Sequence, residues 1–423
     1  MRLLTTNIKP VRLDGFKLHT VRLNEWSTTD VAMMLFYSGM AVAYLGSMNP
    51  WFMWPLADKF AILSAVLLVS SYGVSNMHVS LRTNQMDYLL PTTAYFILTF
   101  YQIFIRGQNV NAYIVNIFYV ITFCCLFMTR REHVKHFCDL MAKGMGGFLA
   151  VSMFFFLLYL AGFPLPSRDA DFMNIYSFAN YYFFLIDTRT FFEIIPRFHS
   201  VFLEPGHMGT MTALLLFTQI GRWRRWYNLS LLLATIISFS LAAYGLLVAI
   251  IFLGLWIQGK HILKQTLFSV AVIATIIAGS FVYNNGDNLL HDLIILRIEI
   301  DDGELAGDNR VTDSFKADYE SLLQSSDVLV GRDRNNEEFG NSGYRVFIYD
   351  YGLIGLLFVC LFYLAALHTP HNMRAVVAVF IVGGMNFVVR GYPLWFANFL
   401  PLYYLARCTQ VHMTESSSKL KTE

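Results

Sequence analysis

The sequence predicts an all-α polytopic membrane protein with about twelve transmembrane helices and two long outward-facing loops. Hydrophobic residues make up 56% of the 423 residues and charged residues only 14%, unlike the composition of soluble globular domains. Apolar runs long enough to cross a bilayer recur along the chain. Basic residues gather in alternate connections between these runs, which is typical of the cytoplasmic loops of membrane proteins.

Each predicted span must be helical, because lipid offers no partner to unpaired backbone groups. In chain order the spans are 30–48, 58–75, 88–105, 110–128, 139–162, 205–221, 226–242, 244–259, 265–283, 346–367, 373–389 and 392–407. The closely spaced pair within 226–259 is interpreted as a tight hairpin that turns near 243–245. A single fused span there would break the alternation of charge between successive loops.

Charge also predicts the orientation of the chain. Basic residues lie in the N-terminal segment 1–29, in the loops before the fifth, seventh, ninth and eleventh spans, and in the tail 408–423. These segments share one side when the number of spans is even, and the positive-inside rule makes that side the cytoplasm. Residues 1–423 then form a single membrane domain with both termini cytoplasmic. No cysteine falls in a predicted outer loop, so no disulfide framework is expected.

Two long connections, 163–204 and 284–345, are predicted to face outward. The first carries prolines and aromatic runs, and the second is acidic, with 14 Asp or Glu against 6 Lys or Arg. Loops of this length in a compact protein are usually functional. Within the second loop, Asp313–Ser325 has Phe315 and Leu322 at helical spacing, which predicts a short amphipathic helix.

The stretch from Arg197 to Gly209 concentrates charge at the mouth of an apolar segment. Such charge costs free energy unless water, a partner or a ligand compensates it. Arg197 and Glu204 would share one face if the stretch were helical, and Glu204-Pro205 is typical of a helix start. An outward-facing helix N-terminus beside Arg197 suits a phosphate. The alternative is an internal Arg197–Glu204 pair that only holds the loop.

Other polar residues border the same predicted outer surface. His199 and His207 are candidate proton acceptors or, alternatively, hydrogen-bonded interfacial histidines. Arg310 lies in the middle of the second loop, where a guanidinium could clamp a phosphate in bidentate fashion. Arg345 and Arg390 lie at the outer ends of two spans. Substrate binding and snorkelling toward water are both consistent with their positions.

Signatures of soluble enzymes are missing from the sequence. It has no P-loop, no GxGxxG, no HExxH and no nucleophile elbow. It also lacks zinc-ligand spacing and a DxD-like site in a cytoplasmic loop, so we expect no metal and no cofactor. The net charge is only +2, so the overall charge does not identify a partner, and we expect no nucleic-acid partner.

Three elements occur in a characteristic order. A span begins at Arg197…Ser200-Val-Phe-Leu-Glu-Pro-Gly-His207, and a hairpin of spans then contains Ser238-Phe-Ser-Leu-Ala-Ala243. A large outer loop follows, with Asn309-Arg310 near its middle and Gly340-Asn-Ser-Gly-Tyr344 at its end. This combination resembles the O-antigen polymerase (Wzy) and O-antigen ligase superfamily over roughly residues 190–365.

The resemblance implies a glycosyltransferase of the bacterial inner membrane. It would act at the periplasmic face on glycans linked to undecaprenyl pyrophosphate, without a metal. The residues implied as catalytic are Glu204, Arg197 and Arg310: Glu204 is the first candidate for the base, and both arginines would hold the pyrophosphate. The residues expected to contact substrate are His199, His207, Arg345, Arg390 and Asn341.

Three functions stay open, and a polymerase is favoured. The ligase branch usually has a His-Asn pair near the end of the large loop, whereas this chain reads Gly340-Asn341. A transporter or flippase for lipid-linked sugars should carry charge deep in several spans and have shorter loops. The product is left open among O-antigen of lipopolysaccharide, capsule and exopolysaccharide. A chain-length regulator is an open partner, besides membrane lipid and the lipid-linked oligosaccharide.

Overall fold

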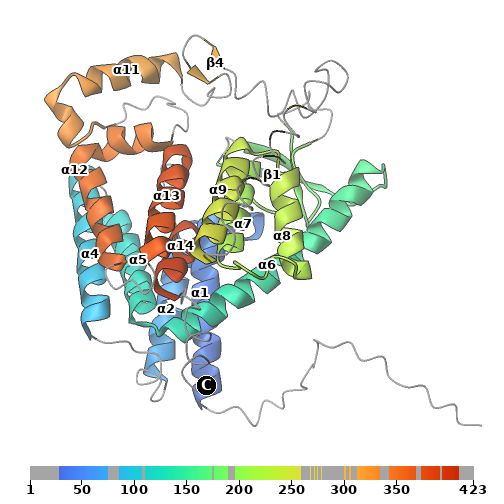
Figure 1. Ribbon diagram of the computed structural model, residues 1–423, viewed down its shortest axis with the longest axis horizontal. Helices are drawn as coiled ribbons and strands as arrows, with labels where there is room; N and C mark the ends of the chain where they lie inside the picture. The colour runs from blue at the N-terminus through green and yellow to red at the C-terminus, as the bar shows by residue number, and fades with distance from the viewer. Residues whose placement is uncertain are drawn as a thin grey trace, which may run out of the picture.

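The protein is seen here in a computed structural model (Figure 1). It describes residues 28–74, 85–106, 110–173, 176–188, 196–258, 300–301, 304–305, 312–333, 343–367, 373–390 and 393–408, and four helical positions at 267, 271, 274 and 278. Helices dominate these residues, and the strands are few and short. Six of the described helices are long and apolar enough to cross a membrane. The chain is therefore a largely helical membrane protein.

The first half of the chain contributes an antiparallel helical layer. Its elements are α1 (Thr28–Met48), the 3-10 helix η2 (Trp51–Leu56), α2 (Lys59–Gly73), α4 (Gln85–Arg106), α5 (Val110–Met128) and α6 (Arg131–Leu160). α1 packs along α2, and α5 packs on both α2 and α4. α6 is the longest of the described helices and runs obliquely across the molecule (Figure 1).

The second half supplies the buried centre of the molecule. Its helices are α7 (Pro205–Phe217), α8 (Trp226–Ile237), α9 (Leu241–Gln258), α12 (Gly343–Ala366), α13 (Met373–Arg390) and α14 (Phe396–Cys408). Nearly every residue of α7 and α14 is buried. An apolar helix can be covered by lipid or by other helices, and here neighbouring helices cover both. Accordingly α7 lies between α8 and α9, and α14 contacts α1, α6, α7 and α13.

Eleven of the twelve predicted spans coincide with these helices. The remaining one, 265–283, lies almost wholly outside the described residues. How many of the helices cross the membrane stays a prediction, since several are shorter than a bilayer requires. The predicted hairpin turn near 243–245 was wrong: the chain turns at 238–240, and 243–245 lies inside α9. Phe239, with φ at 47°, makes the turn that Ala243-Tyr-Gly245 was expected to make.

A small antiparallel sheet occupies part of the predicted loop 163–204, where no strand was predicted. It is formed by β1 (Arg168–Phe172), β2 (Tyr176–Asn180) and β3 (Leu185–Asp187) in that order. Its apolar face packs against η2, with Trp54 beside Phe178. The following chain is tied down as well, because the amide of Trp51 donates to the carbonyl of Val201 at 2.9 Å.

The helix predicted over Asp313–Ser325 is confirmed as α11 (Asp313–Leu323), capped by the hydroxyl of Thr312. It lies across the end of α12, and Figure 1 shows the first part of α12 bending under it. The bend is at Gly352, whose φ of 64° interrupts the helical geometry. The 3-10 helix η5 (Ser326–Leu329) lies in this bend, and a Cβ on Gly352 would lie 2.2 Å from the carbonyl oxygen of Leu329.

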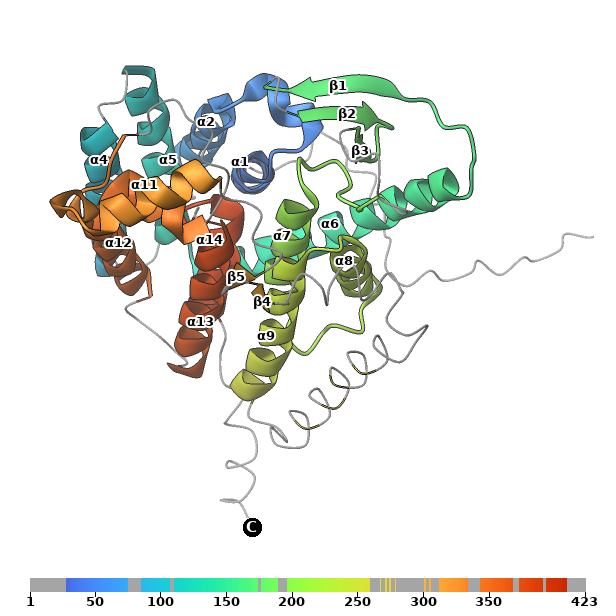
Figure 2. The ribbon, with the colours of Figure 1, turned by 90° about the horizontal axis from the view of Figure 1, so that it is seen from above.

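The sheet and α11 lie at the same end of the helices, opposite the start of α1 (Figures 1 and 2). Seen from above, the sheet covers η2 on one side, while α11 covers α4 and α12 on the other (Figure 2). A short pairing of β4 (Ile300–Asp301) with β5 (Glu304–Leu305) lies near that end too (Figure 1). We call this end the loop face. The direction it faces in the cell stays a prediction.

Candidate active site

Glu204 is the centre of a polar cluster at the loop-face end of α7. Its backbone is extended, and Pro205 occupies the first position of the helix, so the predicted helix start at Glu204-Pro205 is confirmed. One carboxylate oxygen accepts a hydrogen bond from Arg390 at 2.9 Å, and the other accepts one from the hydroxyl of Tyr176 at 2.8 Å. His207 lies one turn into the helix, with Nε2 3.8 Å from the carboxylate.

Three elements distant in sequence build this cluster. Glu204 and His207 come from the start of α7, Tyr176 from the first position of β2, and Arg390 from the last position of α13. The segment before α14 adds Trp395, whose ring meets the His207 ring edge-on at a centroid distance of 5.0 Å. The small sheet therefore positions the hydroxyl of Tyr176 against the Glu204 carboxylate.

Arg390 is almost completely buried, with 2% of its side chain exposed, whereas 24% of Glu204 is exposed. Among the residues that the structure describes, Nε and Nη2 of Arg390 have no hydrogen-bond partner. A buried guanidinium that uses only part of its donors has capacity left for another oxygen. The guanidinium of Arg390 can lie here only because residue 206 is a glycine: a Cβ on Gly206 would lie 1.8 Å from Nη2 of Arg390.

Electrostatics keep Glu204 ionised. Burial alone would raise the pKa of its carboxyl, but electrostatic interaction with His207 and Arg390, with hydrogen bonds from Arg390 and Tyr176, lowers it to about 2. The result is a partly exposed carboxylate that stays charged at every physiological pH. Such a group binds hydroxyl donors well and is a weak proton acceptor until the donor itself becomes acidic.

Arg197 lies at a different place from the one expected. The chain before α7 is not helical, so Arg197 and Glu204 do not share a helix face. Its guanidinium donates to the carbonyls of Phe239 at 3.0 Å and Ser238 at 3.4 Å, just beyond the end of α8. The expected alternative of an Arg197–Glu204 pair is wrong, since the carboxylate is paired with Arg390 instead. A contact of Arg197 with substrate stays a prediction.

His199 is a buried structural histidine in this arrangement. Its Nδ1–H donates to the carbonyl of Phe202 at 2.5 Å, and its ring packs near Phe178. Burial lowers the pKa of its imidazole to about 4. With 2% exposure it has no open path to a substrate hydroxyl. The geometry thus favours the structural alternative for His199, while His207 belongs to the Glu204 cluster.

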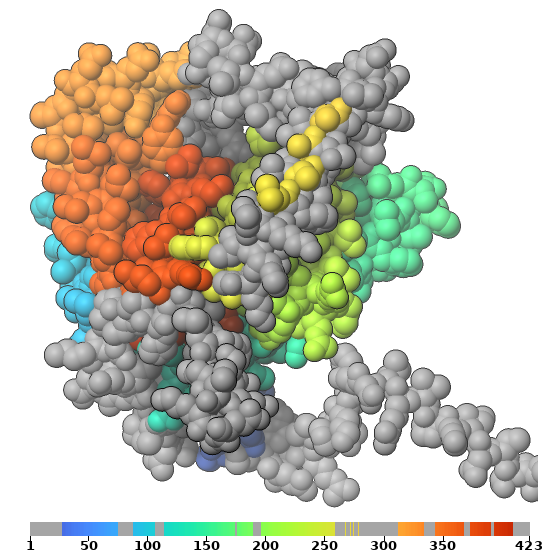
Figure 3. All heavy atoms as spheres, in the orientation of Figure 1, coloured from blue at the N-terminus to red at the C-terminus, as the bar shows by residue number. Residues whose placement is uncertain are grey.

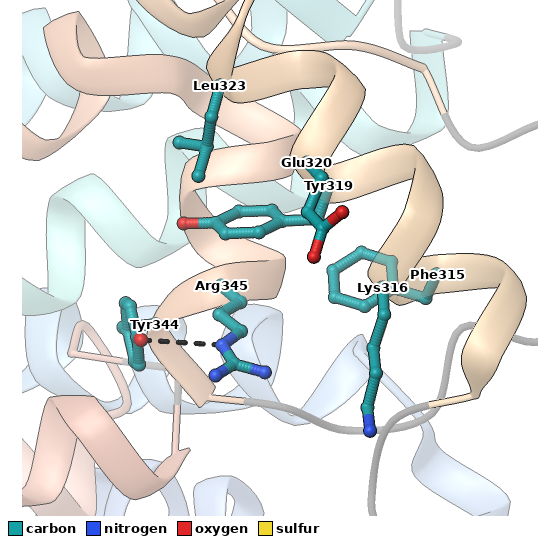
Figure 4. A pocket seen from close by; sticks show the side chains of 7 residues that line it. All are labelled: Phe315, Lys316, Tyr319, Glu320, Leu323, Tyr344 and Arg345. Atoms are coloured by element: carbon teal, nitrogen blue, oxygen red, sulfur yellow. Dashed lines mark hydrogen bonds between the residues drawn. The ribbon is translucent and has the colours of Figure 1, made fainter. Parts of the chain in front are cut away.

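The other predicted site residues fall into two groups. Arg310 and Asn341 lie outside the described residues. Arg345 lies in the first turn of α12, where it lines a cavity of about 320 Å³ against α11 (Figure 4). The described residues hold no cluster of His, Cys, Asp or Glu that could bind a metal ion.

Sequence reasoning missed Tyr176 and Trp395. Tyr176 belongs to a strand that no pattern indicated, and Trp395 lies in a short connection between two apolar segments. Only the aromatic richness of 163–204 hinted that this loop would pack on the site.

No protein-family model, curated protein or solved structure matches this chain. Its function is therefore inferred from the site and from the order of its motifs.

Proposed function

We propose that this chain is a polysaccharide polymerase that joins repeat units carried on undecaprenyl pyrophosphate at the periplasmic face of the inner membrane. The observation that supports this most is the ionised Glu204, held by Arg390, Tyr176 and His207 at the loop face of a membrane protein. A carboxylate in this position suits the hydroxyl group of a sugar. The lipid-linked donor in this proposal is based on the order of the motifs described above.

The reaction follows from the chemistry of such a donor. The oxygen of an acceptor hydroxyl attacks the anomeric carbon of the donor sugar, and the bond from that carbon to the pyrophosphate oxygen breaks. Its electron pair leaves with undecaprenyl pyrophosphate, and the hydroxyl proton passes to Glu204. Although Glu204 is a weak base, the attacking oxygen becomes strongly acidic as the glycosidic bond forms. One such displacement inverts the anomeric configuration.

The positively charged groups have separate tasks in this proposal. Arg390 fixes the orientation of Glu204 through the hydrogen bond that it donates to the carboxylate. Arg310 is proposed to hold the pyrophosphate, where positive charge would stabilise the negative charge that develops on the leaving oxygen. Arg197 is proposed to shape the turn between α8 and α9 beside this site.

A transporter is less consistent with the distribution of buried charge. Asp350, Arg390 and Arg407 are the buried Asp and Arg residues in the described part of the chain. Arg390 and Arg407 lie at the ends of α13 and α14, and Asp350 lies beside the bend of α12. Transported substrates usually require charged groups near the middle of the membrane.

Deletion of the gene followed by gel analysis of the cell-surface glycan tests the proposal. A polymerase mutant should lose the ladder of long chains and keep a single repeat unit on the acceptor. Glu204→Gln should reproduce this phenotype. The control is Glu132→Gln, which removes an exposed carboxylate in the first turn of α6 and should leave the ladder unchanged. Loss of every glycan from the acceptor would point to a ligase or a flippase instead.

A further inference from the structure

The cavity between α11 and the first turns of α12 is not used by the proposed reaction. It has a volume of about 320 Å³ and is lined by residues of both helices: Phe315, Lys316, Tyr319, Glu320, Leu323, Tyr344 and Arg345. This volume is within the range of small-molecule sites. Figure 4 shows Tyr319 between the two helices, with the charged ends of Lys316 and Arg345 extending toward the same side.

The walls of the cavity are fixed by the packing beneath it. Phe315 is fully buried and contacts the rings of Tyr319 and Tyr349. The hydroxyl of Tyr349 donates to Asp318 at 2.5 Å, and Arg332 binds Asp318 at 3.4 Å. These contacts hold α11 on α12, and the two helices form one continuous mass in the space-filling view (Figure 3). The cavity is therefore bounded by two helices whose relative position is fixed by these contacts.

Its lining combines aromatic faces with an excess of positive charge. Tyr319 and Tyr344 are partly exposed, so both can offer ring faces to a ligand. Lys316 and Arg345 contribute two positive charges, and Glu320 contributes one negative charge. Arg345 also lies near the Tyr344 ring, 6.0 Å from its centroid, with Nε 3.4 Å from its hydroxyl. The guanidinium N–H donors of Arg345 therefore lie beside the aromatic ring of Tyr344, an arrangement that suits a sugar ring with an anionic substituent.

The cavity also lies close to the Glu204 cluster. Tyr344 follows Gly343, and a Cβ on Gly343 would lie 2.0 Å from the carbonyl oxygen of Val388. Val388 is two residues before Arg390, which holds Glu204. The first turn of α12, which lines the cavity, therefore packs beside the end of α13 that carries Arg390.

We propose that this cavity binds an acidic sugar of the glycan, with its ring against Tyr319 and Tyr344 and its carboxylate between Arg345 and Lys316. The inference rests on the proposed function and adds a substrate class to it: glycans that contain a uronic acid or a similarly charged sugar. The pyrophosphate of the lipid carrier is the other source of negative charge, and the experiment separates the two.

The test is direct binding to the purified full-length protein in detergent. The probes are a tetrasaccharide of alternating glucuronate and N-acetylglucosamine, the same compound with its carboxyl groups reduced to alcohols, and inorganic pyrophosphate. We expect the acidic probe to bind about tenfold or more tightly than the reduced one, as one charged hydrogen-bonded contact provides. Arg345→Gln and Lys316→Gln should each remove most of this preference.

The matched control is Arg168→Gln, which removes an exposed arginine of the loop face that lies over Trp51, away from the cavity. It should keep the full preference, and the thermal unfolding midpoints of all variants should stay near that of the wild type. Equal binding of the two tetrasaccharides, or no saturable binding of the acidic one, would overturn the inference. Displacement of the acidic probe by pyrophosphate, dependent on Arg345, would overturn it in favour of a phosphate site.

Failure of the proposed function would look different. If deletion left the long-chain ladder intact while the binding preference held, the polymerase proposal would fail and the sugar site would stand. If deletion removed the ladder but the preference was absent, the sugar site alone would fail.

Discussion

At the scale of single residues, the site depends on what each charged group is paired with. Glu204 and Arg390 are 186 positions apart, yet they form the closest ion pair of the site at 2.9 Å. Arg197 is only seven positions from Glu204 and serves the end of α8 instead. Proximity in sequence was therefore a poor guide to pairing, because the intervening chain is not helical and turns at Ser200.

The pH dependence of stability follows from the Glu204 carboxyl. Its pKa is lowered from 4.5 to about 2, so its pairing stabilises the folded state fully above pH 4.5 and is lost as the pH falls toward 2. Glu204→Gln should lower the thermal unfolding midpoint at neutral pH, and the difference from wild type should shrink below pH 4.5. Thermal unfolding in detergent from neutral pH to about pH 3 measures this. A difference that is independent of pH would contradict the assigned pairing.

Arg197→Ala should act through the fold. It leaves two carbonyls at the α8–α9 turn without their charged donor, at a cost of about 1–3 kcal/mol. We expect a lower unfolding midpoint together with reduced glycan chain length, and partial rescue by Arg197→Lys. An unchanged midpoint with complete loss of long chains would show that Arg197 acts on the substrate instead.

At the scale of elements, the start of α7 depends on a close approach that only glycine permits. Gly206→Ala would drive Arg390 away from its position, because the new Cβ would overlap Nη2. The variant should lose polymer formation and unfold at lower temperature. Gly245→Ala in α9 is the matched control, since no atom lies within 4 Å of its added Cβ. There the gain in helix propensity, about 0.5–1 kcal/mol, should leave activity intact. Equal effects of the two substitutions would contradict the proposed packing.

The helical elements were largely predictable, and the small elements were not. Long apolar runs permit only helices in lipid, so α1, α2, α4 to α9 and α12 to α14 were expected near their observed positions. The strand β1 reads Arg-Asp-Ala-Asp-Phe, in which only Ala170 and Phe172 alternate with polar residues, and β3 has three residues. Such strands are defined by their long-range pairing, which no local pattern contains.

The polar contacts of the candidate site could likewise be predicted only in part. Glu204 and His207 were identified because charge at a helix mouth is unusual. Their partners Tyr176 and Arg390 come from other elements, and only the folded chain shows which of the candidate arginines meets the carboxylate. Arg345 was correctly expected near a span end, but its cavity requires the position of α11.

At the scale of the whole molecule, the account requires the loop face to lie outside the cytoplasm. In a variant without native cysteines, Ser177→Cys in β2 and Ser321→Cys in α11 are exposed at that face. Both should react with a membrane-impermeant maleimide in intact cells whose outer membrane has been made permeable. Arg224→Cys, exposed between α7 and α8, should react only after the inner membrane is opened. Reversed labelling would contradict the orientation and the periplasmic reaction.

The most direct measurement is polymerisation by the purified protein. Lipid-linked repeat units extracted from deletion cells would be incubated with the wild-type protein or with Glu204→Gln in proteoliposomes, and glycan length and free undecaprenyl pyrophosphate would be measured together. The account predicts chains of increasing length and one released carrier per bond formed. Glu204→Gln should be slower by about a hundredfold or more. Chains that do not lengthen with the wild-type protein, or the same rate with Glu204→Gln, would contradict it.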